Sequence, residues 1–149
     1  MAIVSASSDV INPLDDHLGY QLRRASSFLM TVLARRLTEI GLTATEASVL
    51  ILISSNEGIT QSEIGRVLGI KRANMAPLTA SIERRGFVAR RAVDRKSQGL
   101  AITDAGLTAA RDSERLMLEN DRALFGPLLP RERKIFREFL DPLWKDSTE

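Results

Sequence analysis

The residues whose types and spacing point most directly to chemistry lie in one segment, GIKRANMAPLTASIERRG, which spans residues 69–86. Successive residues of an α-helix turn by about 100°, so a helix through this segment has two different apolar sides. One side is bulky and consists of Met75, Leu78 and Ile82. The opposite side, here named the small-residue face, consists of Ala73, Ala76, Pro77 and Ala80. Short side chains let a helix approach a partner closely, and the DNA major groove admits a helix at such a distance.

Polar residues beside this face fit the same purpose. Arg72 and Asn74 could read guanine and adenine edges, respectively, while alanine and proline surfaces could touch thymine methyl groups. Arg84 and Arg85 lie farther along and are expected to meet phosphates, and Lys71 adds another cation to the predicted DNA-binding set. The alternative is a helix that its proline merely bends to follow the fold, with alanines present for helix propensity.

A turn sequence, DRKSQG at residues 94–99, lies between two stretches of strand character, FVARRAV and LAI. Arg95 and Lys96, at the tip of such a hairpin, could reach an adjacent minor groove, where narrow A·T tracts attract arginine. Asp94 could hold Arg95 in a defined orientation through a charge-assisted hydrogen bond and so support the tip. The alternative is an ordinary solvent-exposed turn.

The distribution of charge favours a polyanionic partner. Residues 60–103 carry nine Lys or Arg and three acidic residues, a local charge of +6, whereas the rest of the chain has a local charge of −4. A basic region between acidic arms is typical of a surface that meets a polyanion. Chance clustering on a solvated surface remains the alternative.

A helix-turn-helix is expected to position the small-residue face. Thr60 and Glu63 have the spacing of a capping box at the start of a short helix, and Gly69 supplies the turn into the next one. The inward side of the short helix is expected to hold Ile64, Val67 and Leu68. The hairpin that follows Gly86 completes the layout of a winged helix.

Four further helices are expected around this unit. Apolar residues recur at three- and four-residue steps across residues 16–40, and a capping-box spacing at Thr43 begins a buried helix that ends near residues 55–56. Thr103 caps a helix that runs to about residue 125. A last helix starts near residue 130, and Pro142 is expected to bend or end it. The side chains that this last helix is expected to bury are Ile135, Phe136, Phe139, Leu140 and either Leu143 or Trp144.

The predicted fold class is mainly α with a small β-hairpin wing (α+β), namely a winged helix-turn-helix with N- and C-terminal dimerisation helices. We expect one domain over residues 1–149, with its core at about 43–103 and dimerisation helices at about 16–40 and 104–144. The core has no room to bury the apolar sides of the outer helices, and burying one Leu or Phe contributes roughly 1.5–3 kcal/mol. A second copy of the chain is therefore the expected partner. A monomer whose outer helices pack together is the alternative.

The sequence resembles the MarR family of bacterial transcription regulators over about residues 14–143. The residues that carry the resemblance are Leu68, Gly69, Ile70, Glu83, Gly86, Arg90 or Arg91, Asp94, Arg95, Lys96, Leu100, Ile102, Thr103 and Gly106. The resemblance implies a homodimer that binds a pseudo-palindromic double-stranded operator, usually as a repressor. Residues 71–85 would form the recognition helix and Arg95 would enter the minor groove. Two departures, Lys96 for the usual Arg and Ala76-Pro77 where many members have Thr-Arg, imply a more apolar base readout.

The resemblance also implies a small ligand, often a phenolic or other aromatic acid, that releases the DNA from a pocket between the dimerisation helices and the DNA-binding lobe. Near the start of the first helix lie His17, Tyr20, Arg23 and Arg24, which could stack on an aromatic ring and pair with a carboxylate. They indicate an effector such as an aromatic acid or an acyl thioester. In the alternative, the two arginines are solvated and His17 only begins the helix.

Several classes of function are disfavoured. The absence of cysteine excludes thiolate catalysis, and the single histidine, His17, cannot assemble the common His/Cys zinc site within one chain. Neither a nucleophile elbow nor a glycine-rich phosphate loop is present, so we expect no enzyme, no cofactor and no metal. No stretch approaches the roughly 18 consecutive apolar residues of a membrane span, and we expect a cytoplasmic protein without a membrane partner. A winged-helix protein-interaction module without DNA readout is the remaining alternative.

Overall fold

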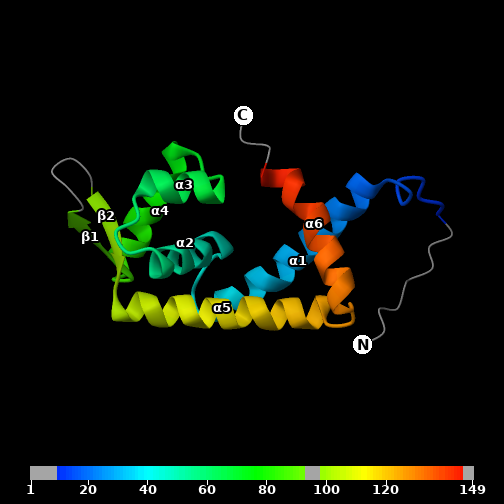
Figure 1. The fold of residues 1–149 in the computed structure, drawn as a ribbon. Coiled ribbons are helices and arrows are strands. Elements are labelled where there is room, and N and C mark those ends of the chain that lie inside the picture. Colours follow the sequence, from blue (N-terminus) through cyan, green and yellow to red (C-terminus); the bar gives the residue numbers. More distant parts are fainter. Residues whose placement is uncertain (1–9, 93–97, 146–149) are drawn as a thin grey trace.

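The computed structural model describes residues 10–92 and 98–145. Its elements follow one another as α1 (Leu18–Glu39), α2 (Ala44–Ser55), α3 (Gln61–Leu68), α4 (Arg72–Arg84), β1 (Val88–Ala92), β2 (Gln98–Ile102), α5 (Asp104–Phe125) and α6 (Pro130–Lys145). Figure 1 shows α5 as a long base, with the hairpin at one end and α6 at the other. The predicted fold class, a mainly helical winged helix-turn-helix with a small β-hairpin, is confirmed.

Three helices begin at the threonines that the sequence indicated. Thr43 accepts a hydrogen bond from the backbone N–H of Glu46 at 3.1 Å, and the Glu46 carboxylate accepts one from the N–H of Thr43 at 2.9 Å. Thr60 and Glu63 form the same capping box at the start of α3. Thr103 caps α5 through its hydroxyl oxygen. These bonds satisfy backbone donors that a helix leaves free, so local sequence fixes where α2, α3 and α5 start.

The two strands form an antiparallel hairpin in which Val88 lies opposite Ile102. The N–H of Leu100 also donates to the carbonyl of Ile59 at 2.9 Å, and this bond joins the hairpin to the connection between α2 and α3. The base of the hairpin is therefore fixed on the helix-turn-helix. Its tip, residues 93–97, lies outside the described residues, and so do the predicted tip residues Asp94, Arg95 and Lys96.

The hydrophobic core lies where α2 meets α3, α4, the hairpin and α5. Helix α2 contributes most to it, because most of its apolar side chains are buried on all sides. The buried apolar residues are Leu37, Leu42, Ala47, Val49, Leu50, Ile53, Ile64, Met75, Ile82, Val88, Leu100, Ala110 and Leu116. This core packs the first turns of α5 and the last turns of α1 against the helix-turn-helix.

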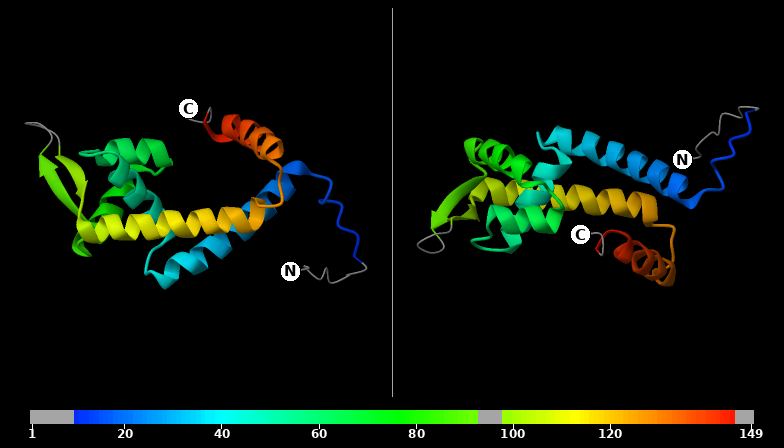
Figure 2. Two further views of the ribbon diagram at one scale, coloured as in Figure 1. Left: turned by 60° about the horizontal axis from the view of Figure 1, so that its bottom comes forward. Right: turned by 90° about the horizontal axis from the view of Figure 1, so that it is seen from above.

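Helix α6 has no buried residue in the single chain. Both views in Figure 2 show α6 turned back beside the end of α5 that is farthest from the hairpin. Large apolar side chains are exposed along α1 and α6, among them Leu18, Leu22, Phe28, Ile135, Phe136, Phe139, Leu143 and Trp144. The apolar side of α6 is thus present as the sequence predicted, and its expected burial against a second copy of the chain stays a prediction.

One prediction is corrected and another is narrowed. Val67 is 52% exposed and does not face inward. Gly65 lies on the packed side of α3, where an added β-carbon would lie 3.0 Å from the carbonyl oxygen of Ile70 and 3.2 Å from Cγ of Met75. Val67 lies about 200° around the helix from Gly65 and therefore faces outward.

Of the two outcomes expected at Pro142, a bend or an end of the helix, the end does not occur, because α6 continues to Lys145. Proline has no N–H to donate to the carbonyl of Glu138, four residues earlier. Glu138 is exposed, so water can donate to that carbonyl instead.

Within residues 10–92 and 98–145, no single helix has both the length and the apolar character that a membrane crossing requires. Helices α1 and α2 meet those two criteria only when taken together, as a pair bent by 73°.

Candidate nucleic-acid interface

The small-residue face lies on the outer side of α4. Its four residues are all exposed, whereas Met75 and Ile82 on the opposite side are buried and Leu78 is half-buried. Thr79 is buried as well, and its hydroxyl donates to the carbonyls of Met75 and Ala76 at 2.9 and 3.1 Å. The two-sided pattern read from the sequence is therefore the arrangement of the folded helix, and no other part of the described chain covers the small-residue face.

A tight turn presents the start of α4. Gly69 has φ +64°, in the left-handed region that favours glycine, and the N–H of Ile70 donates to the carbonyl of Gly65 at 2.8 Å. The backbone then enters α4 through Lys71, which stands at the N-cap without a side-chain capping bond. This turn places the first residues of α4 beside the first residues of α3.

Cations surround the small-residue face without local acidic partners. Lys71, Arg72 and Arg84 are exposed, and in the part of the chain that the structure describes no carboxylate lies within salt-bridge distance of them. Asn74 is exposed between them. Because a surface cation without a protein partner keeps its charge available, this side of α4 can attract an anion such as a phosphate.

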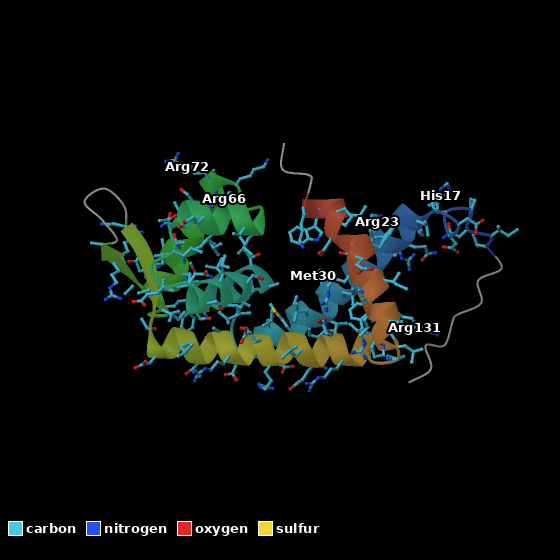
Figure 3. The ribbon with its side chains drawn as sticks, viewed as in Figure 1. His17, Arg23, Met30, Arg66, Arg72 and Arg131 are labelled. Atoms are coloured by element: carbon cyan, nitrogen blue, oxygen red, sulfur yellow. The ribbon has the colours of Figure 1, made fainter. Side chains whose placement is uncertain are left out.

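Part of this surface was not predicted from the sequence. A hollow of about 460 Å³ opens between α3 and α4, and Gln61, Ser62, Arg66 and Arg72 contribute polar side chains to its lining. Figure 3 shows Arg66 and Arg72 at the same end of the molecule, on the side away from α5. The signal was present in the sequence, because residues that directly follow a helix N-cap expose backbone donors to an anion.

Two ion pairs hold the hairpin in place. The Nε atom of Arg90 donates to both carboxylate oxygens of Glu83 on α4, at 3.1 and 3.2 Å. Arg91 pairs with Glu57 beyond the end of α2, with 2.5 Å between Nη1 and Oε1. The arm of the wing is thus tied to α4 on one side and to the α2–α3 connection on the other.

Arg85, which the sequence grouped with Arg84 as a phosphate contact, makes hydrogen bonds within the chain that Arg84 does not share. Its guanidinium is turned toward the protein and bonds the carboxylate of Glu46 and the carbonyl of Gly41. The partners of Arg85 lie 39 and 44 residues away in the sequence, so no local pattern could have identified them.

Three of the four predicted effector residues lie together on α1. The hydroxyl of Tyr20 accepts a hydrogen bond from Nη1 of Arg24 at 3.1 Å, and the guanidinium carbons of Arg23 and Arg24 lie 5.2 and 5.8 Å from the centroid of its ring. The bond from Arg24, with a weaker one from Asn12, lowers the pKa of Tyr20. His17 stands at the N-cap of α1 and makes no capping bond with its side chain.

A separate apolar groove of about 480 Å³ lies between α1 and α6. Its lining consists of Leu18, Gly19, Gln21, Leu22, Ala25, Phe136, Phe139, Leu140 and Leu143. None of the four predicted effector residues lines this groove. No group of three or more His, Cys, Asp or Glu side chains suited to a metal occurs among the described residues.

The sequence is similar to those of known transcription regulators. Residues 40–97, which contain α2, α3, α4 and the start of the hairpin, match a model of the MarR family. The HTH-type transcriptional repressor Rv2887 of Mycobacterium tuberculosis is 26% identical over 134 residues, which cover 89% of this chain and 96% of that protein. The similarity therefore extends across the outer helices as well as the DNA-binding region.

Solved structures with the same fold cover nearly the whole chain. The transcriptional repressor CouR, bound to p-coumaroyl-CoA, is 27% identical with a TM-score of 0.78, and the match covers 91% of this chain and 97% of CouR. The MepR–DNA complex of S. aureus is 18% identical with a TM-score of 0.79, over 89% of this chain and 97% of MepR, and shares the fold.

Proposed function

Because the chain belongs to the MarR family of transcription regulators, we propose that it binds double-stranded DNA sequence-specifically and represses transcription until a small molecule releases it. The observation that carries this proposal is the exposed small-residue face of α4, bordered by cations that no described carboxylate pairs with. Close backbone approach together with free positive charge is what a major-groove helix needs.

Each proposed contact has a distinct role. Arg72 and Asn74 read base edges, and the small-residue face, Ala73, Ala76, Pro77 and Ala80, makes apolar contacts in the groove. Lys71 and Arg84 meet phosphates, and Arg66 and the start of α3 add further phosphate contacts. Arg95 and Lys96, with Asp94 in support, remain proposed minor-groove contacts from the sequence.

We further propose that the protein acts as a homodimer. Residues 43–103 would then form the DNA-binding unit, and residues 16–40 and 104–144 the dimerisation helices. The exposed apolar side chains of α1 and α6 support this arrangement, because a groove lined by Leu22, Phe136 and Phe139 is costly to leave in water. Two-fold symmetry would place two copies of α4 about 34 Å apart, one turn of the duplex.

The effector is proposed to be an organic anion with an aromatic ring, such as an aromatic acid or an acyl thioester. CouR is a relative solved with p-coumaroyl-CoA, which belongs to this class. Within this chain, Arg23 and Arg24 flank Tyr20, so a ring could stack and a carboxylate or phosphate could pair there. His17 remains a weaker candidate, since it makes no capping bond that would fix its side chain. Calorimetric titration with aromatic acids and acyl thioesters tests this proposal. If none of these compounds releases heat and none reduces DNA binding, the proposal is rejected.

The proposed DNA binding is tested by measuring duplex affinity against salt concentration for the wild type, Arg72→Ala and Arg111→Ala. Arg111 is an exposed arginine on α5 and serves as a charge-matched control. Affinity of the wild type should fall steeply with salt, because phosphate contacts release counterions. Arg72→Ala should weaken specific binding by about tenfold or more, since a bidentate base contact is worth about 1–3 kcal/mol. Equal effects of the two substitutions would point instead to a protein-interaction module.

A further inference from the structure

One side chain joins three elements that lie far apart in the sequence. Arg85 directly follows α4 as its C-cap residue. Its Nη1 donates to Oε1 of Glu46 at 3.2 Å, and its Nη2 donates to the carbonyl of Gly41 at 2.6 Å. The guanidinium carbon also lies 4.7 Å from the centroid of the Phe87 ring. The end of α4 is thereby fastened to the corner where α1 ends and α2 begins, here named the α1–α2 corner (residues 40–46).

Both acceptors in this corner are themselves held in place. Glu46 is only 8% exposed, and its second oxygen, Oε2, accepts hydrogen bonds from the backbone and hydroxyl of Thr43. Gly41 has φ +71°, which turns the chain out of α1 and directs its carbonyl to Arg85. Both carboxylate oxygens of Glu46 are thus engaged, one in the α2 cap and one with Arg85. The contact is therefore a two-pronged one in which the carboxylate is nearly buried, although the Arg85 side chain keeps 36% of its surface exposed.

The last turn of α4 is also held by the hairpin, because the Glu83 carboxylate accepts hydrogen bonds from Nε of Arg90. A helix fastened at its C-terminal end to two neighbours keeps a fixed direction relative to both. The direction of α4 decides whether the small-residue face, one to three turns earlier, can enter a groove at the correct depth.

We propose that Arg85 is a positioning residue that sets the direction of α4 from the α1–α2 corner and so determines how well the protein discriminates its operator from other DNA. This inference rests on the proposed DNA-binding function. It also connects the C-terminal end of α1, at Gly41, to the helix that reads DNA.

The competing explanation is that Arg85 is simply another phosphate contact. The two explanations predict opposite changes in DNA affinity when Glu46 loses its charge. If Arg85 met phosphates, removing the negative charge of Glu46 would leave DNA binding unchanged or strengthen it for every sequence. If Arg85 positions α4, Glu46→Gln weakens operator binding although the protein becomes more positive. Arg85→Lys sharpens the comparison, because lysine keeps the charge and loses the fork that bonds two acceptors.

The experiment uses the full chain and measures affinity for a selected operator duplex and for a scrambled duplex, at several salt concentrations. The variants are Arg85→Lys, Glu46→Gln, the double variant, and Arg111→Lys as control. Glutamine at position 46 can still complete the capping box with Thr43, so α2 keeps its start. Circular dichroism melting and light scattering establish that each variant is folded and has the wild-type mass.

We expect each single variant to lower the ratio of operator to scrambled affinity by about tenfold, as loss of a hydrogen bond to a charged group does. The double variant should lose no more than either single one, because both remove the same contact. Scrambled binding, its salt dependence and the control should match the wild type. Arg85→Lys with wild-type discrimination, or Glu46→Gln with tighter binding to both duplexes, overturns the proposal.

If the wild type itself bound both duplexes equally, the proposed function would fail, and amide hydrogen exchange would then test the inference. Arg85→Lys should speed exchange at residues 79–86 and at the α1–α2 corner, relative to Arg111→Lys. Unchanged exchange in both segments overturns the proposal whatever the DNA result.

Discussion

The outer side of α4 can approach a partner closely because its side chains are short. Alanine ends at its β-carbon, and the ring of Pro77 stays close to the backbone, so the small-residue face offers little that could hold the helix away from a partner. The cations that attract DNA stand beside this face rather than on it, with Arg72 at the start of α4 and Arg84 at its end. Attraction and close fit are thus assigned to different residues.

Ala76→Leu tests the requirement for short side chains. The added bulk should keep α4 from its depth in the groove and weaken operator binding by about tenfold or more, comparable to a lost base contact of about 1–3 kcal/mol. Stability should change by no more than about 0.5 kcal/mol, because Ala76 is exposed. Ala105→Leu, at an exposed alanine in the first turn of α5, is the control and should bind normally. Equal affinities of the two variants would refute a role for small size.

The sequence could predict which residues of α4 face outward, because helical periodicity decides this locally. It could not predict the direction of Arg85, whose neighbour Arg84 has the same side chain and is exposed. The two differ because Arg85 lies opposite Glu46 and Gly41, and only the packing of the α1–α2 corner brings these groups to it.

At the scale of elements, the hairpin and α5 meet without space between them. A β-carbon on Gly106 would lie 1.9 Å from the carbonyl oxygen of Phe87 and 2.9 Å from Cδ1 of Ile102. Gly106→Ala should therefore force the hairpin away from α5 and lower the free energy of unfolding by about 1–3 kcal/mol. Gly19→Ala, in α1 with open space around it, should instead raise it by about 0.5–1 kcal/mol. Urea unfolding measures both, and destabilisation by Gly19→Ala or none by Gly106→Ala would contradict this packing.

The capping box of α3 should make stability depend on pH. Hydrogen bonds from the backbone and side chain of Thr60 hold the pKa of Glu63 below its ordinary value of 4.5. A carboxylate whose pKa falls on folding stabilises the protein above its unfolded pKa, and this contribution is lost as the pH falls through the folded value. Glu63→Gln keeps the cap without the charge, so its unfolding free energy should decline less than that of the wild type below pH 4.5. Glu114→Gln, at an exposed glutamate on α5, should follow the wild type. Parallel pH curves for Glu63→Gln and the wild type would show that the cap is not ionic.

Element boundaries were largely predictable because threonine caps and left-handed glycines are local signals. The inward side of α3 was not, since Gly65 lies on the packed side of the helix and Val67 lies on the opposite side, exposed to solvent. Likewise, Pro142 carries a local signal for a break that the solvated end of α6 tolerates.

At the scale of the whole molecule, α1 and α6 present apolar side chains that the single chain leaves in water. An apolar pattern indicates which side of a helix avoids solvent. It does not indicate whether that side packs against the same chain or against another one. This is why the sequence identified the side of α6 that carries Phe136 and Phe139, while its expected cover, a second copy of the chain, stays a prediction.

Phe139→Glu tests whether a second copy covers this side. Phe139 is 57% exposed and lines the groove between α1 and α6, so a buried charge there should disrupt the proposed dimer. Light scattering should find a monomer with weaker operator binding. Arg131→Glu introduces the same side chain at the exposed start of α6 (Figure 3) and should remain dimeric. A wild type that is already monomeric, or a Phe139→Glu variant that stays dimeric, would reject the proposed interface.

Selection of bound duplexes from a random pool tests the central claim most directly, because α4 can read DNA only if particular sequences are enriched. The account predicts an enriched site with two inverted half-sites whose centres lie about 34 Å apart, one turn of the duplex. It also predicts that the enrichment disappears with Ala76→Leu and persists with Ala105→Leu. A pool without enrichment, or one enriched for a site without two-fold symmetry, would contradict it.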